Sequence, residues 1–393
     1  MNTQNTPVHI RLWHHEFWMM ALANLLLTMA VYVLLPLMPD WMMRTQNLSF
    51  QETGLAMAAF GVGLFTLGCF TSFLTQRYRR NKVCMAAILL MIVSPLGLLY
   101  YLDTQQASFA SFSVILLQRM ALGATFGIAQ MILSSTLIID TCESFQRTEA
   151  NHAASWFSRF ALSLGPLAGL VIGRQTGFSM VVLTAMGCAA AAILLIMLVH
   201  FPFRAPEEDT PTFSLDRFLL PQGWPLFLNL LMITIVMGML MSVGLSEQFY
   251  AMMMTGFLLA LLAQRFVFRD AELKSEVVSG LVLMGAALLM MLTRHQAIVS
   301  FAAPTFISFG IGIIGSRFLL FFIKLSRHCQ RGTSQSTFML AWESGIAFGL
   351  GIGYALLEGN QEQVLQLSLD ITVVALLFYN FMTHNWFLKH KNR

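Results

Sequence analysis

Charged side chains that fall inside long apolar stretches are the first candidates for chemistry in this sequence. They are Arg119, Arg159, Arg317 and Glu343. A charged residue at the centre of a membrane helix costs roughly 2.5–3.5 kcal/mol on insertion scales, and such residues mark binding sites, gates and proton relays. Glu343 is the only acid well inside one of the predicted spans. We therefore identify it as the candidate carboxylate for proton coupling.

Arg119 lies ten residues into the apolar stretch 109–137. At about 1.5 Å per residue, this depth is roughly the middle of a ~30 Å hydrocarbon core. Gly123 and Gly127 follow at i+4 and i+8, so the helix face beside the guanidinium is smooth. Arg119 is expected to bind an anionic substrate group, a carboxylate or a water chain. The alternative is a packing arginine that is bonded to backbone carbonyls.

Uncharged polar side chains at depth in other stretches are further candidates for ligand contacts. They are Asn24, Gln130, Asn229 and Thr234. Hydrogen bonds between helices are an equally expected use for such groups. The five cysteines show no CxxC or Cys/His zinc spacing, and HExxH, GxSxG and GxxxxGK[ST] motifs are missing. We therefore expect no enzyme activity, no cofactor and no metal site.

Apolar stretches long enough to span a bilayer must position these residues. Of the 393 residues, 57% are hydrophobic and 11% are charged, against about 25% charged in an average soluble domain. A spanning helix needs about 20 apolar residues, and twelve stretches qualify. The predicted spans are 16–38, 51–73, 82–102, 109–137, 153–173, 179–201, 224–245, 248–268, 275–293, 297–323, 336–357 and 364–388.

The basic residues predict the orientation of these spans. When the N-terminus is placed inside, only Arg44, Arg174 and Arg294 of the 23 Lys and Arg residues fall in the outer loops. The sequence thus predicts a multi-pass protein of the inner (plasma) membrane with both termini cytoplasmic. The net charge of +4 is the excess that this topology itself produces, so we expect a lipid bilayer around the protein and no nucleic-acid partner. We expect a monomer.

An internal repeat relates the two halves of the chain. The segment RTEANHAASWFSRFALSLGPLAG in the fifth span aligns with RGTSQSTFMLAWESGIAFGLGIG in the eleventh at a constant offset of 184. The matches are Arg147 with Arg331, Gly165 with Gly349 and Gly169 with Gly353. Duplicated, parallel six-span halves place a substrate between them near the membrane midplane. We predict an all-α membrane protein in which residues 1–200 and 224–393 form two pseudo-symmetric six-helix bundles and 201–223 form a cytoplasmic linker.

The same offset pairs Arg159 with Glu343, so opposite charges occupy equivalent positions. They are expected to face one another as a gate or a proton-sensitive pair, because protonation of the acid removes the attraction. Arg317 offers Glu343 a second partner, in a static bridge. Small residues recur every fourth position from Ala161, and Arg159 lies about 200° around the helix from that residue, so it points away from this packing face.

Three segments resemble motifs of the major facilitator superfamily, in particular its proton-coupled drug-efflux antiporters. The loop SFLTQRYRRNKV resembles the family's basic inter-helix motif, with Arg77 and Arg80 on the motif's arginines. Its first glycine, its aspartate and its second glycine are replaced by Ser72, Gln76 and Arg79. The segment LLQRMALGATFG resembles the motif in which an arginine, here Arg119, is implicated in proton transfer.

The third segment, ALSLGPLAGLVIG, resembles the antiporter signature of the fifth span. It retains Gly165, Pro166 and Gly169, whereas Ala161 and Leu170 replace the first and last glycines. The resemblance covers nearly the whole chain. It implies the major facilitator fold and a secondary active transporter that moves a small hydrophobic or amphipathic molecule by alternating access, in proton-coupled efflux. The first span lacks an embedded acid, so coupling rests on Glu343. A facilitative or uptake carrier for a specific metabolite is the alternative, because one fold supports many functions.

Overall fold

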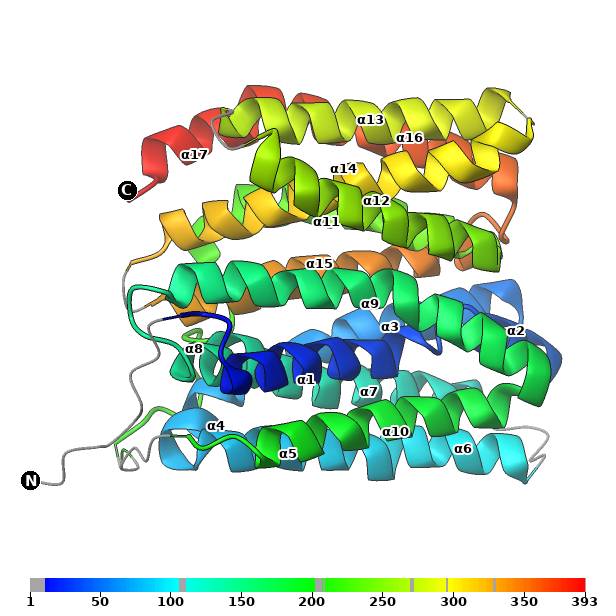
Figure 1. The fold of residues 1–393 in the computed structure, drawn as a ribbon. Helices are drawn as coiled ribbons and strands as arrows, with labels where there is room; N and C mark the ends of the chain where they lie inside the picture. Colours follow the sequence, from blue (N-terminus) through cyan, green and yellow to red (C-terminus); the bar gives the residue numbers. More distant parts are fainter. Residues whose placement is uncertain are drawn as a thin grey trace, which may run out of the picture.

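A computed structural model describes residues 11–105, 111–201, 207, 209–268, 272–294, 296–327 and 330–392. In the described residues the chain makes twelve helical crossings of a single stack (Figure 1). The first six are α1 (His15–Tyr32), α3 (Phe50–Thr66) with α4 (Thr71–Arg77), α5 (Arg80–Met91) with α6 (Gly97–Thr104), α7 (Phe112–Ile132) with α8 (Ile138–Asp140), α9 (Arg147–Thr176) and α10 (Phe178–Met197). The last six are α11 (Trp224–Met241), α12 (Glu247–Phe266), α13 (Leu273–Thr293), α14 (Ala297–Leu325), α15 (Arg331–Ala355) and α16 (Gln361–Phe378) with α17 (His384–His390). The predicted all-α, twelve-helix fold is confirmed.

Ten of these crossings are long and apolar enough to span a membrane, judged over the described part of the chain. The other two are α1 and α15. Buried polar side chains such as Asn24 and Thr28 on α1 and Gln335 and Glu343 on α15 make them less apolar. Since α15 is buried along most of its length, its polar groups face protein rather than lipid. Both crossings therefore contribute buried polar groups to the interior, as α7 and α9 also do through Gln130 and Arg159.

Several predicted boundaries differ from the structure by a few residues, and two of them have a clear physical cause. The first predicted span extends to residue 38, but α1 ends at Tyr32 and residues 33–37 form turns before α2 (Met38–Arg44). Pro36 and Pro39 explain the break, because proline lacks an amide hydrogen and disfavours helical backbone in the preceding residue. The eleventh crossing begins at Arg331, five residues before the predicted start at 336. The first turns of α15 are polar yet mostly buried, so hydropathy alone underestimates the length of this helix.

The helices before and after the linker form two groups that lie one above the other, with α9 and α15 at their junction (Figure 1). Across this junction the fifth crossing, α9, packs against the eighth, α12, and the eleventh, α15, packs against the second, α3. If each crossing is replaced by the one six positions away in the chain, the α9–α12 pair becomes the α15–α3 pair. The same replacement also exchanges the α1–α9 contact with the α11–α15 contact. The packing therefore has the pseudo-symmetry that the repeat predicts.

One end of the stack carries the start of α1, the end of α17 and the linker residues that precede α11 (Figure 1). The arginines Arg80, Arg147, Arg217 and Arg331 gather around a cavity at this end. We refer to it as the basic end. It is the end that the distribution of Lys and Arg predicts to be cytoplasmic.

Glycines allow helices to approach closely at two places that matter for the site. On α7, a Cβ added to Gly123 would lie 2.1 Å from the carbonyl oxygen of Phe60 on α3. On α9, a Cβ added to Gly165 would lie 2.7 Å from Cβ of Tyr32, and one on Gly169 would lie 2.2 Å from the carbonyl oxygen of Val33. Small residues thus bring α1 against α9, as in other membrane helix interfaces. This contact fixes the position of Tyr32.

The substitution Gly123→Ala is expected to lower the free energy of unfolding by about 1–3 kcal/mol, the usual cost of overpacking. Thermal unfolding of the purified protein in detergent measures the effect. Gly187→Ala on α10 is the matched control, because nothing lies within 4 Å of a Cβ built there. Alanine favours a helix over glycine by about 1 kcal/mol, so the control should unfold at the same or a higher temperature. Equal unfolding temperatures for both variants would contradict the close contact.

Candidate functional site

A cavity of about 30 Å³ lies at the centre of the junction between the two bundles. Helices α1, α7, α9 and α15 and the π-helical turn that follows α7 line it. Its lining residues are Asn24, Gln130, Ser134, Ser155, Ser158, Arg159, Gln335, Phe338, Met339, Trp342 and Glu343. Four residues that sequence reasoning selected, Asn24, Gln130, Arg159 and Glu343, therefore lie around one space. We refer to it as the central cavity.

Glu343 bonds across the junction to the first bundle. Its side chain is buried, with 4% exposed, and each carboxylate oxygen lies 2.9 Å from the hydroxyl of Tyr32, which donates to the carboxylate. Tyr32 is 1% exposed and comes from the other bundle. A buried carboxylate needs hydrogen bonds or a counter-charge, and this phenol supplies the bond. The carboxyl group is thus placed where its protonation state affects the contact between the bundles.

Sequence reasoning did not select Tyr32. The available signal was its spacing, because Asn24, Thr28 and Tyr32 follow one another at i, i+4 and i+8 and so share one face of α1. Thr28 uses its hydroxyl within the helix, donating to the carbonyl oxygen of Asn24 at 2.8 Å. Asn24 and Tyr32 instead bond to other helices, Asn24 to α9 and Tyr32 to α15.

Arg159 is 2% exposed and crosses from α9 toward the second bundle. Its guanidinium donates to the hydroxyls of Ser316 at 3.3 Å and Ser155 at 3.2 Å. The guanidinium carbon lies 4.6 Å from the ring centre of Trp156 and 5.9 Å from that of Trp342. Its Nε has no hydrogen-bond partner, and no described carboxylate forms an ion pair with it. A buried cation held by hydroxyls and aromatic faces can receive an anionic group.

Asn24 and Gln130 form a polar layer within the first bundle. Gln130 Nε2 donates to Asn24 Oδ1 at 2.6 Å. Asn24 Nδ2 in turn donates to the carbonyl oxygen of Ala154 at 2.9 Å and to Ser158 Oγ at 2.8 Å. These bonds connect α1, α7 and α9. The Oε1 atom of Gln130 is buried without a partner, which leaves an acceptor at the cavity.

Arg317 does not bridge to Glu343, and that interpretation is wrong. Its Nε donates to the fully buried carboxylate of Glu276 on the neighbouring helix α13. Glu276 was overlooked because it lies at the very start of the predicted span 275–293. Within the described residues neither Arg159 nor Arg317 forms an ion pair with Glu343. The carboxylate therefore has a phenol as its partner instead of an arginine.

Arg119 lies outside the lining of the central cavity. Its guanidinium is buried beside Met38, with Nη1 3.4 Å from the sulfur, and its central carbon lies 5.2 Å from the ring centre of Phe60. Its Nε has no partner. The residue sits in the first bundle between α2, α3 and α7, so a direct contact with a molecule in the central cavity is not part of this arrangement.

Asn229 and Thr234 make helix-to-helix hydrogen bonds in the second bundle. Asn229 Nδ2 donates to the carbonyl oxygen of Ala375 at 3.0 Å, and Thr234 Oγ1 donates to that of Ala341 at 3.2 Å. Neither residue lines the central cavity. Both are used in packing in this structure, which is the alternative that sequence reasoning left open.

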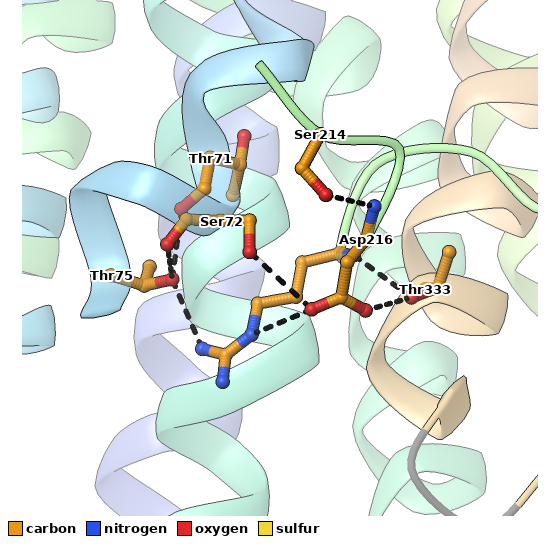
Figure 2. A network of polar contacts seen from close by, with 7 residues as sticks. Thr71, Ser72, Thr75, Ser214, Asp216 and Thr333 are labelled. Atoms are coloured by element: carbon orange, nitrogen blue, oxygen red, sulfur yellow. Dashed lines mark hydrogen bonds and ion pairs between the residues drawn. The ribbon is translucent and has the colours of Figure 1, made fainter. Parts of the chain in front are cut away.

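The segment that resembles the basic inter-helix motif forms a junction with the linker (Figure 2). Asp216 accepts from Ser72 at 3.4 Å and from Thr333 on α15 at 2.9 Å. The backbone N–H of Arg217 also donates to Thr333, at 2.8 Å, and its side chain donates to Thr75 on α4 at 3.0 Å. The linker thus supplies an acid beside the segment in which Gln76 replaces the motif's aspartate.

The two motif arginines have different surroundings. Arg80, at the start of α5, forms an ion pair with Asp140 at the end of α8, at 2.7 Å. This pair joins two crossings of the first bundle. Arg77 ends α4 and is exposed. At this end, Asp216 and Arg217 of the linker connect α4 to α15 through side-chain hydrogen bonds.

Comparisons with known proteins agree with this architecture. The sequence profile of the Major Facilitator Superfamily matches residues 20–350. No curated protein sequence matches the chain. The similar solved structures include a bacterial homologue of the human lysosomal transporter Spinster in an inward-facing, unoccupied conformation, with 15% identity, a TM-score of 0.67, and 96% of this chain and 98% of that chain covered.

Two further solved structures are similar over most of the chain. The human organic anion transporter MFSD10 has 16% identity and a TM-score of 0.68, with 92% of this chain and 98% of that chain covered. A bacterial homologue of the iron transporter ferroportin in an outward-facing state has 13% identity and a TM-score of 0.66, with 95% and 99% covered. At these identities the likeness establishes the fold alone.

Proposed function

Because the chain belongs to the Major Facilitator Superfamily, we propose that it is a proton-coupled secondary transporter that exports a small hydrophobic or amphipathic molecule across the inner membrane. In this proposal the two bundles alternate in access around the central cavity, both termini are cytoplasmic and the monomer is the working unit. The observation that carries the proposal is the buried carboxylate of Glu343, bonded to Tyr32 of the opposite bundle.

The bond between Tyr32 and Glu343 gives protonation a route to conformation. The ionised carboxylate accepts a charge-assisted hydrogen bond from the phenol, and such bonds are roughly twice as strong as neutral ones. A proton on Glu343 removes the charge and weakens the contact between α1 and α15. The bundles then separate more readily. Arg159 adds a positive charge to the same cavity, without an ion pair to this carboxylate among the described residues.

The substrate class follows from Arg159 and its aromatic neighbours. An acidic group can bind the guanidinium, whose Nε is unpartnered, while an apolar body lies against Phe338 and Trp342. The central cavity of about 30 Å³ is far smaller than typical ligand pockets of about 300–1,000 Å³. The bundles must therefore move apart to admit such a molecule, as alternating access requires. We propose an amphipathic organic anion as the substrate.

The direction of transport rests on α9. Its residues Gly165, Pro166 and Gly169 resemble the signature of efflux antiporters, and both glycines pack against α1 next to Tyr32. Transport in proteoliposomes under an imposed proton gradient tests the proposal, with amphipathic anions and cations as substrates and a pH dye inside. Substrate-dependent proton flux is the expected result. Transport without any pH response would contradict proton coupling and favour a facilitative carrier.

The linker junction predicts a second measurable behaviour. The bonds of Asp216 to Ser72 and Thr333 must break when the basic end opens, so Asp216→Asn should favour the open state. Replacing charge-assisted bonds by neutral ones should raise access to this end about tenfold. The measurement is the rate at which a thiol reagent modifies an Ile139→Cys variant, in a background without the five native cysteines. Ile139 lines the cavity at the basic end.

Asp209→Asn, in the same linker and exposed, is the matched control and should leave the rate unchanged. If both variants raise the rate equally, loss of linker charge rather than the junction explains the effect. If neither does, the junction does not restrain the bundles.

A further inference from the structure

A second cavity, of about 280 Å³, lies between the bundles at the basic end. Four arginines line it, and Asp140 is the one carboxylate among its described lining residues. Asp140 forms an ion pair with Arg80 at 2.7 Å, and Arg217 lies 3.7 Å from Asp216. Arg147 and Arg331 have no ion pair within the part of the chain that the structure describes. The cavity therefore carries an excess of positive charge. We refer to it as the basic cavity.

Two helix N-termini open onto the basic cavity. Arg147 is the first residue of α9 and Arg331 is the first residue of α15, and Thr148 and Gly332 follow them in the lining. Neither helix has a side-chain hydrogen bond at its N-cap. Free backbone N–H groups and the helix dipole make such termini favourable for anions. Arg147 and Arg331, which the repeat relates at an offset of 184, thus line the same cavity, one from each bundle.

Buried polar atoms without partners point to a ligand in the same place. Ser135 is 5% exposed, and its hydroxyl has no hydrogen-bond partner. Asn151 is 2% exposed, and its Oδ1 has none either. Both residues line the basic cavity. A hydroxyl can donate to an anion, and an amide can present its NH₂ after a flip of its end. Buried polar groups are normally paired, so these two indicate a missing partner.

We propose that the basic cavity binds a phosphate group between Arg147 and Arg331 and so holds the two bundles together at this end. A phosphate has several acceptor oxygens and accepts paired N–H bonds from arginine, which suits two guanidiniums and two helix N-termini that line one cavity, one from each bundle. The group is part of a soluble phosphate compound or of a lipid headgroup. An adjoining cavity of about 460 Å³, lined by Lys324, Arg327 and Arg331 with no acid among its described lining residues, extends the positive surface.

Binding of inorganic phosphate to the purified full chain in detergent tests the soluble source, with calorimetric titration and thermal unfolding as readouts. Phosphate should bind and raise the unfolding temperature. Arg147→Gln and Arg331→Gln should each weaken binding at least about tenfold, since each removes charge-assisted hydrogen bonds. Arg265→Gln is the matched control: it removes the same charge from an exposed position on α12 and should bind phosphate normally. Ser135→Ala keeps every charge and should also weaken binding.

The lipid source is tested in nanodiscs of phosphatidylglycerol, which has an anionic phosphate headgroup, and of a neutral galactolipid, which has no phosphate. Stabilisation by the anionic lipid that Arg147→Gln and Arg331→Gln abolish, without binding of inorganic phosphate, assigns the site to a headgroup. Binding of free phosphate assigns it to a soluble compound. The proposal is overturned if neither source stabilises the chain. It is also overturned if Arg265→Gln loses as much binding as the cavity variants.

Discussion

Glu343→Gln is expected to abolish pH-driven transport and reduce accumulation under a proton gradient to the level of protein-free liposomes. Glutamine keeps the shape of the side chain and still accepts a hydrogen bond from Tyr32, but it cannot take up a proton. The central cavity contains no other carboxylate among its described lining residues. Loss of coupling with folding retained is therefore the expected pattern. Substrate binding or downhill exchange should persist, since neither requires a proton to move.

The control for this variant is Glu362→Gln, which makes the same change at an exposed position near the start of α16. It should transport as the original chain does. Tyr32→Phe separates the two roles of the pair, because it removes the bond between the bundles and leaves the carboxyl group in place. Proton flux should survive in Tyr32→Phe. Undiminished coupling in Glu343→Gln would eliminate Glu343 as the coupling group and leave its bond to Tyr32 as a structural contact.

Arg159→Gln is expected to impair transport of acidic amphipathic substrates selectively. Loss of a charge-assisted hydrogen bond worth roughly 1.5–3 kcal/mol corresponds to an apparent KM about 10- to 100-fold higher. Neutral analogues of the same substrates should be transported with little change. Arg159→Lys keeps the charge but loses the planar fork, so it should recover part of the affinity. The measurement is initial uptake rate against substrate concentration for matched acidic and neutral compounds.

Arg174→Gln provides the control on the same helix. The side chain of Arg174 is 80% exposed near the end of α9, and its ion pair with Glu247 spans 3.7 Å. Removing that charge should leave both substrate classes unaffected. If Arg159→Gln raises the apparent KM of acidic and neutral compounds equally, then Arg159 organises the junction through Ser316 and Trp342 instead of binding an anionic group.

The two variants together separate the charges that share the central cavity. Glu343 belongs to the second bundle and bonds to the first, whereas Arg159 belongs to the first and bonds to the second. The duplication places them at equivalent positions, yet each has its own partner. We therefore expect Glu343→Gln to lose proton coupling and keep its substrate preference. We expect Arg159→Gln to lose the preference for acidic substrates and keep proton coupling.

Local properties of the sequence determined the general architecture. Apolar length predicts spans because a helix must cross a fixed hydrocarbon thickness, and the repeat predicts that α9 and α15 occupy equivalent places in two bundles. Polar side chains at depth, such as Asn24, Arg159 and Glu343, are expected to face the protein interior because lipid excludes such groups. These results need no knowledge of which helix faces which.

The choice of partners was decided by tertiary structure alone. Arg317 bonds to Glu276 instead of Glu343 because α13 lies beside α14, and Tyr32 reaches Glu343 because the glycines of α9 let α1 approach. Asp216 joins α4 to α15 only through the path of the linker. Spacing along one helix defines a face, but the rotation of that face toward a neighbour depends on packing summed over the whole bundle. For that reason the sequence identified most of the charged groups, and the fold decided what each of them bonds to.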